Sequence, residues 1–491
     1  MASEPAVVIG SGIAGLASAI RLKAQGYEVT ILEASPVPGG KNRDFYRDGF
    51  RFDAGPSVFT LPELLKDTLS SAGLDPDEFI SIRELEASCR YFWRDGTTLT
   101  AWTDPDRFAR EAEQVLGEPA ESIHRFLGRA EKIYNLTEPL FLKKSLHRIS
   151  TYLNRDAWRA LVNLPAIDTH RTLDQAVRSS IRNTKLQQLF NRYATYNGSD
   201  PFQAPATLSV IAHLEHTRGA YFPDGGMISV SRSLVKAAEK LGIAMHLNTR
   251  AQEILFQNGK VTGVRTDGQV WPAQVVVSNM DIHYTYHHLL PTIDPPDRLL
   301  SQPKSSSALI FYWGIRGETP SFGLHNIFFS DQYRQEFDDL FQKHQIPADP
   351  TVYLYISSKL NRADAPAGHE NWFVMINVPN NQGQEWDRMI NQIRPVILKT
   401  LSQAAGFDVS ERLVTESSLD PRSIESQTLS WQGALYGNSS NNRFAAFLRH
   451  KNFLSSVRGL YIAGGSVHPG GGVPLCLLSA KIVSDLVKER E

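Results

Sequence analysis

Two glycine-rich loops, one near each end of the chain, carry the residues best suited to chemistry. The first is Gly10-Ser-Gly-Ile-Ala-Gly15, and the second lies within Gly459–Pro474. Each follows an apolar run typical of a buried strand and precedes a helical pattern. Loops of this kind expose backbone N–H groups at the positive end of a helix, which suits a phosphate group. By contrast, the sequence displays no Ser-His-Asp, paired-carboxylate or metal-ligand arrangement that would identify a catalytic group.

The first loop lies within a complete nucleotide-binding βαβ pattern. A strand, a helix and a second strand are predicted at Ala6–Ile9, Leu16–Gln25 and Val29–Leu32. Gly10 permits the tight turn, Gly12 lets the backbone approach a pyrophosphate, and Gly15 lets the helix pack closely on the strand. We expect the free N–H groups at the start of the helix, at Ile13 and Ala14, to face the same phosphates.

Glu33 follows the second strand directly and is placed to accept hydrogen bonds from ribose hydroxyls. An acid at this position disfavours a 2′-phosphate, so the nucleotide is expected to be FAD or NAD rather than NADP. A lone G-x-G-x-x-G often marks only a turn. Here strand, glycines, helix, strand and acid all occur at the required spacings, which favours a nucleotide site.

Two further turns favour FAD. The chain continues with Gly39-Gly40-Lys41 and then with Gly55-Pro56-Ser57. This order resembles the extended FAD fingerprint of the amine-oxidase and phytoene-desaturase superfamily, in which both turns run beside the flavin. The resemblance implies FAD as the cofactor and places Gly40, Lys41, Pro56 and Ser57 in its site.

The resemblance extends over essentially the whole chain, and its most specific part is His468-Pro-Gly-Gly-Gly-Val-Pro474. Together with the block Gly219–Asn279, this run is similar to bacterial-type phytoene desaturases and other carotenoid desaturases. The residues after Pro474, and the run Gly433–Ser440, resemble the 1-hydroxycarotenoid 3,4-desaturase branch most. The likeness adds these residues to the cofactor site: Ala251, whose backbone would meet the adenine, and Gly465, Gly472, Val473 and Pro474.

The implied reaction removes two hydrogens from adjacent sp³ carbons of a long carotenoid, with FAD as the hydride acceptor. The sequence holds no second G-x-G-x-x-G with a following acid, so oxygen or a membrane quinone is expected to reoxidise the flavin. The catalytic residue stays unknown. His468 and Lys41 lie in loops next to the flavin by analogy, where each would either polarise the flavin or be structural. For His468 we favour the structural role.

Four other functions stay open at this stage. A phytoene desaturase and a carotenoid isomerase share the same motifs. A flavin amine oxidase would act on polar amines, and the His468–Pro474 run counts against it. A prenyl-binding chaperone of this fold that has lost FAD is disfavoured, because Glu33, Gly39-Gly40-Lys41 and both glycine loops are retained.

The expected fold class is α/β (α+β overall): a Rossmann-like FAD-binding domain, a mixed-sheet substrate domain and a helical subdomain. The predicted FAD domain is discontinuous and comprises residues 1–75, 220–282 and 455–491. The substrate domain is predicted to comprise 76–103 and 283–454, and the helical subdomain 104–219. Apolar, β-branched runs predict the second sheet at Ser307–Gly314, Asn326–Ser330, Val352–Ser357 and Trp372–Val378. Val270–Ser278 is predicted as a single strand.

Two stretches of the helical region suggest contact with substrate or membrane. Glu138–Pro165 interleaves basic residues with leucines and aromatics, which suits either an anionic membrane surface or an ordinary bundle helix with a solvated basic face. Asn191–Leu208 is aromatic and rich in small residues. Its Tyr193, Tyr196 and Asn197 would line a pocket for a long apolar substrate, or the segment would be a helix-breaking part of the core.

Composition narrows the class of protein. With 491 residues, 42% hydrophobic and 21% charged, the chain is expected to be globular and to have two or three domains. A net charge of −1 argues against a nucleic-acid-binding protein. Only Cys89 and Cys476 occur, which excludes a disulfide framework and a multi-cysteine metal site. With no basic leader and no long apolar span, we expect a cytoplasmic protein that meets a membrane only at its surface.

Overall fold

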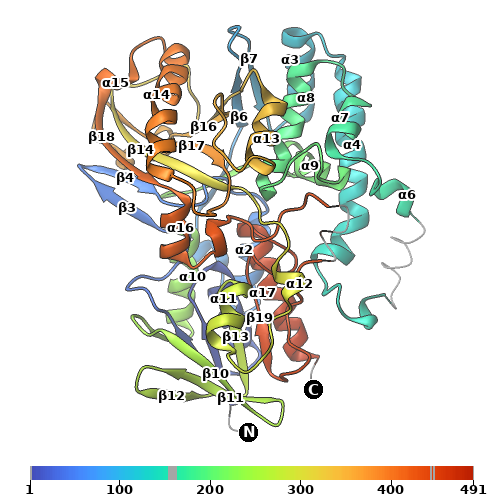
Figure 1. Cartoon of the computed structure of the whole chain (residues 1–491), viewed down its shortest axis with the longest axis vertical. Coiled ribbons are helices and arrows are strands. Elements are labelled where there is room, and N and C mark those ends of the chain that lie inside the picture. The colour runs from blue at the N-terminus through green and yellow to red at the C-terminus, as the bar shows by residue number, and fades with distance from the viewer. Residues whose placement is uncertain (1–2, 153–162, 443–444, 446–447, 490–491) are drawn as a thin grey trace.

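The computed structural model describes residues 3–152, 163–442, 445 and 448–489. The last part of the Glu138–Pro165 stretch, residues 153–162, therefore lies outside the described residues. The molecule has two stacked halves, with the chain ends in the lower one and the larger sheet in the upper one (Figure 1). Among the described residues, no helix combines the length and apolar character needed to cross a bilayer.

The lower half is built on a five-stranded parallel sheet in the order β19-β13-β1-β2-β9. Its strands are β1 (Pro5–Ile9), β2 (Glu28–Leu32), β9 (Ala244–His246), β13 (Val275–Ser278) and β19 (Leu460–Ile462). One face is covered by α1 (Ile13–Ala24), α2 (Pro62–Ser70), α10 (Ile228–Lys240) and α17 (Val473–Lys488). Segments that are far apart in the sequence supply these strands.

The other face packs against a small antiparallel sheet of β10 (Ala251–Gln257), β11 (Lys260–Thr266) and β12 (Gln269–Pro272). The prediction of one strand over Val270–Ser278 is wrong, because the chain changes sheets within it. Pro272 has no N–H to continue the ladder with β11. Two residues later the N–H of Gln274 donates to the carbonyl of Pro5 at 2.9 Å, and β13 joins the parallel sheet.

The upper half contains a seven-stranded mixed sheet in the order β18-β14-β17-β16-β15-β6-β7. Its strands are β6 (Ala87–Phe92), β7 (Thr98–Trp102), β14 (Ser307–Arg316), β15 (His325–Phe328), β16 (Val352–Tyr355), β17 (His369–Val378) and β18 (Leu413–Leu419). Alternate side chains of β14 enter different cores: Ile310 and Tyr312 face one side, and Phe311 and Trp313 the other. Both faces of β14 are therefore buried, which explains the continuous apolar run that predicted this strand.

Helices cover both faces of this sheet. One face packs on α14 (Trp386–Ala405) and α15 (Val409–Arg412). The other shares a continuous core with the helical layer, which consists of α3 (Pro105–Leu116), α4 (Ala120–Thr137), α7 (Leu173–Arg178), α8 (Thr184–Asn191) and α9 (Val210–His216). The region predicted as a separate helical subdomain is therefore one layer of the upper half, and it stands beside the sheet in Figure 1.

Shorter elements connect the two halves and complete their edges. The strands are β3 (Asp44–Arg47) with β4 (Phe50–Asp53), and β5 (Ile82–Glu84) with β8 (Tyr221–Pro223). The helices are α6 (Leu164–Ile167), α11 (Ile282–Tyr284), α12 (Asp297–Leu300), α13 (Tyr333–Phe341) and α16 (Pro421–Thr428). A 3₁₀ turn, Arg192–Asn197, follows α8 directly and lies in the predicted substrate segment.

Candidate flavin and substrate site

Both glycine loops lie at the carboxyl edge of the parallel sheet. The loop after β1 leads into α1, and the loop after β19 leads into α17. The first N–H groups of an α-helix have no partner inside the helix, so each loop directs unpaired donors and a positive dipole end toward this edge. Four residues predicted to belong to the cofactor site, Gly12, Ile13, Gly472 and Val473, lie at these two helix starts.

Glu33 is held in place at the end of β2. Its carboxylate accepts hydrogen bonds from the N–H and hydroxyl of Ser11, both at 2.7 Å, and from the N–H of Ser35 at 2.8 Å. The N–H of Thr249 donates to the Glu33 carbonyl at 2.7 Å, which brings the start of β10, with Ala251, to the same edge. Glu33 and Ala251 thus lie where a ribose and an adenine are expected to bind.

Asn279 joins the two glycine loops, a role that its place after a strand does not indicate by itself. Its N–H donates to the carbonyl of Ile9 and its side-chain amide to that of Ala463, both at 2.8 Å. A Cβ added to Gly12 would lie 2.7 Å from its Oδ1, and one added to Gly464 2.8 Å from its Nδ2. Both loops therefore need glycine because they close around this side chain.

The Gly39-Gly40-Lys41 loop packs on the first glycine loop, and the Gly55-Pro56-Ser57 turn packs on the Gly39-Gly40-Lys41 loop in turn. Gly40 adopts a φ of +61°, and a Cβ there would lie 3.1 Å from the Cα of Gly12. At Gly55 a Cβ would lie only 1.9 Å from the Lys41 carbonyl oxygen. The Ser57 hydroxyl accepts a hydrogen bond from Tyr353 on β16 at 2.8 Å, which ties this turn to the upper sheet.

Lys41, Asp281 and Cys476 lie close enough to influence one another's ionisation, and Tyr436 follows Leu435, whose carbonyl Lys41 contacts. Each retains solvent-accessible surface, yet desolvation by the surrounding protein is the largest influence on its pKa. It lowers the pKa of Lys41 and raises that of Asp281, while each of the two charges partly offsets the shift of the other. It also raises the pKa of the Cys476 thiol to about 11 and of the Tyr436 hydroxyl to about 12. The Lys41 ammonium donates to the carbonyl of Leu435 at 3.3 Å.

His468 is packed against the segment that precedes α6. Its side chain is buried, and its Nε2 lies 2.9 Å from the carbonyl oxygen of Lys144. Burial lowers its pKa to about 4, so the imidazole is neutral near pH 7. Its own carbonyl accepts from the side-chain amide of Asn452 at 2.7 Å. These contacts support a structural role for His468, as favoured above.

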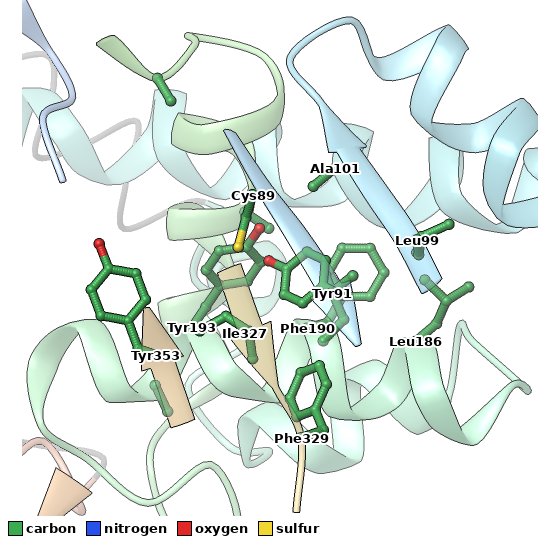
Figure 2. Packing of buried hydrophobic residues seen from close by; sticks show 14 of the residues in the cluster. Cys89, Tyr91, Leu99, Ala101, Leu186, Phe190, Tyr193, Ile327, Phe329 and Tyr353 are labelled. Carbon is green, nitrogen blue, oxygen red and sulfur yellow. The ribbon is translucent and has the colours of Figure 1, made fainter. Parts of the chain in front are cut away.

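The three residues predicted to contact substrate differ in burial and in hydrogen bonding. Tyr193 is fully buried and hydrogen-bonded to Glu215 at 3.0 Å, so it has no surface to offer a ligand; Figure 2 shows its ring inside the packed core. Asn197 is bonded through both ends of its amide, to Ser440 at 2.5 Å and to Arg449 at 3.3 Å. Tyr196 is partly buried, and its hydroxyl donates to Glu215 at 2.5 Å.

These features fit a flavin dinucleotide. Two helix starts, glycine loops in which a Cβ on Gly12 or Gly464 would meet Asn279, an anchored acid at the end of β2 and a nearby lysine together suit pyrophosphate, ribose and an aromatic ring system. Within the residues that the structure describes, no group of three or more His, Cys, Asp or Glu side chains is arranged to hold a metal ion.

Comparison with known proteins agrees with this site. Residues 13–488 match the protein family described as flavin containing amine oxidoreductase. The chain belongs to this family. Its cofactor is therefore FAD rather than NAD.

Curated relatives within this family match nearly the full length. The chain is 45% identical to a 1-hydroxycarotenoid 3,4-desaturase of Flavobacterium sp. over 99% of both chains. It is 30% identical to a 4,4′-diapolycopene oxygenase of Methylomonas sp., covering 99% of this chain and 98% of the relative. Among solved structures, putrescine oxidase bound to putrescine has a TM-score of 0.64 at 14% identity, over 99% of both chains. An oxidoreductase from Methanosarcina mazei has a TM-score of 0.63 at 16% identity, covering 98% of this chain and 100% of that one. These two likenesses concern the fold.

Proposed function

We propose that this oxidoreductase is a carotenoid desaturase that acts on 1-hydroxycarotenoids and introduces the 3,4 double bond. The observation that carries the proposal is the 45% identity, over 99% of both chains, to a protein with that activity. The order of the motifs supports it, because the run from His468 to Pro474 and the residues after it resemble the same branch.

In this proposal, the chain's own residues bind FAD and orient its flavin ring. The starts of α1 and α17 would hold the pyrophosphate, and Glu33 a ribose, so that the flavin ring lies near Lys41 and Tyr436. FAD supplies the hydride acceptor when it is bound. Apolar side chains of the upper half, among them Met375, Leu419 and Leu435, are only partly buried and would line the path of a hydrocarbon chain.

We also propose oxygen or a membrane quinone as the final electron acceptor. The chain has one dinucleotide fingerprint, and FAD occupies it, so a nicotinamide nucleotide has no second site of that type. Turnover that depends strictly on NAD⁺ would contradict this proposal.

Membrane contact is proposed for the segment that begins at Glu138. Its described part places Lys144 against His468 of the cofactor loop, and Tyr152 exposes 42% of its surface. A lipid-dissolved substrate that entered beside this segment would reach the flavin by a short path. The protein is expected to be cytoplasmic and to pellet with anionic phospholipid vesicles but not with zwitterionic ones. Equal, negligible pelleting with both would refute surface binding.

The substrate is tested in cells that make one carotenoid at a time. Strains that accumulate phytoene, lycopene or 1-hydroxylated lycopene would each express the protein, and their pigment spectra would be compared. A red shift only in the hydroxylated strain is expected. Coloured products from phytoene would instead assign phytoene desaturation, and an unchanged spectrum in all three strains would contradict the proposal.

A further inference from the structure

An ion pair is buried inside the apolar core between the seven-stranded sheet and the helical layer. The guanidinium of Arg192 lies 3.6 Å from the carboxylate of Glu215, and both side chains are more than nine-tenths buried. The neighbouring side chains in this core are aromatic and aliphatic. An ion pair in such surroundings adds little to stability compared with apolar residues of the same volume, which calls for another reason for its presence.

Hydroxyl groups converge on this pair. Glu215 accepts hydrogen bonds from Ser88 at 2.9 Å, from Tyr193 at 3.0 Å and from Tyr196 at 2.5 Å. Arg192 donates to the hydroxyl of Tyr91 at 2.6 Å, and its Nε has no hydrogen-bond partner among the residues that the structure describes. Desolvation opposes ionisation of Glu215, but Arg192, His216 and the hydroxyl donors lower the pKa of this carboxyl below its ordinary value.

The orientation of the Tyr196 hydroxyl follows from this network. An ionised carboxylate can only accept hydrogen bonds, so Tyr196 must give its proton to Oε2 of Glu215. The phenol oxygen then has free lone pairs and no proton to offer. Tyr196 is therefore fixed as an acceptor, and its next partner must be a donor such as a hydroxyl group.

Tyr196 also has the right position. Among the tyrosines around the ion pair, Tyr91 and Tyr193 are fully buried, whereas Tyr196 is only partly buried. Two residues later, a Cβ on Gly198 would lie 2.9 Å from the ring of Tyr436. A Cβ on Gly471, in the cofactor loop, would lie 2.8 Å from the Cα of the same Tyr436. One residue thus separates the segment of Tyr196 from the loop that holds the flavin.

We propose that Tyr196 receives the 1-hydroxyl of the substrate, with Glu215 and Arg192 as the positioning residues that fix it as an acceptor. This inference rests on the proposed function. The hydroxyl oxygen is three bonds from C3, so the group that binds it must lie beside the reacting carbons. A carotenoid without the hydroxyl would leave the desolvated Tyr196 oxygen unpaired, and sites of this kind discriminate strongly against the analogue.

The test uses the FAD-loaded Tyr196→Phe variant, with Tyr193→Phe as the matched control. Tyr193 donates to the same carboxylate from a buried position. For each protein, kcat and KM are measured on a 1-hydroxycarotenoid and on the same carotenoid without the hydroxyl. Tyr196→Phe is expected to lower kcat/KM for the hydroxylated substrate at least tenfold and to leave the other value unchanged. Tyr193→Phe is expected to change both values by the same factor.

These measurements distinguish failure of the proposed function from failure of the Tyr196 assignment. If the wild-type protein does not prefer the hydroxylated substrate, the proposed function fails. If the wild type prefers it and Tyr196→Phe retains the full preference, only the assignment of Tyr196 is overturned. Glu215→Gln provides a second variant with the same shape, since an amide can donate to the Tyr196 oxygen and occupy it. This variant is expected to lose the preference as well, and an unchanged preference would again refute the assignment.

Discussion

Replacing Asn279 with alanine tests whether one side chain holds both halves of the cofactor site together. The substitution removes the hydrogen bond of 2.8 Å to the Ala463 carbonyl. It also removes the amide group against which Gly12 and Gly464 pack. Leaving a buried carbonyl without its partner costs about 1–3 kcal/mol. If the loops must be aligned to bind FAD, this cost weakens FAD binding by about 5- to 150-fold.

The assay is titration of the flavin-free protein with FAD, followed by flavin fluorescence. Asn326→Ala is the matched control, because its buried amide donates to Gly323 and Leu354 within the upper sheet, away from both loops. The control is expected to lower the free energy of unfolding and to leave the Kd for FAD unchanged. If Asn279→Ala binds FAD as tightly as the wild type, Asn279 does not couple the loops and the reasoning fails.

Two further predictions concern packing and pH. Gly55→Ala places a Cβ 1.9 Å from the Lys41 carbonyl oxygen, so this variant is expected to lose most of its FAD during gel filtration. Gly128→Ala places a Cβ in open space, so this control is expected to retain its FAD. Burial lowers the pKa of His325 and His468 to about 4 from an ordinary 6.5. Their neutral forms are favoured in the folded state, so stability is complete above pH 6.5 and falls by about 1.4 kcal/mol per pH unit per histidine toward pH 4. Urea unfolding of wild type and His468→Gln at pH 7 and 5 measures this, and equal pH dependence of the two proteins would show that His468 contributes none of it.

Local features of the site were predictable from sequence because each depends on neighbours along the chain. Strand, glycine loop, helix and acid fall within the first 33 residues, and β1, α1 and β2 form as expected. The role of Asn279 was not predictable, because it depends on Gly12 and Gly464, which are far from it in sequence. The break at Pro272 was missed for a related reason: the apolar pattern continues across it, while the partner strands change.

The substrate segment shows where residue type alone is insufficient. Tyr193 and Tyr196 are three positions apart in a 3₁₀ turn and were predicted to act alike. In the fold, one is fully buried and the other retains accessible surface, although both donate to Glu215. Glu215 itself lies on α9 and was not predicted, since a single acid in a helix gives no sign that it will be buried opposite an arginine.

The mass of the product formed by the purified, FAD-loaded protein from a 1-hydroxycarotenoid tests the central claim most directly. The account predicts a product lighter by two hydrogens, formed in an amount equal to the bound FAD when no electron acceptor is present. A product of unchanged mass would indicate isomerisation. A product heavier by oxygen would indicate an oxygenase like the Methylomonas relative, and either result would contradict desaturation.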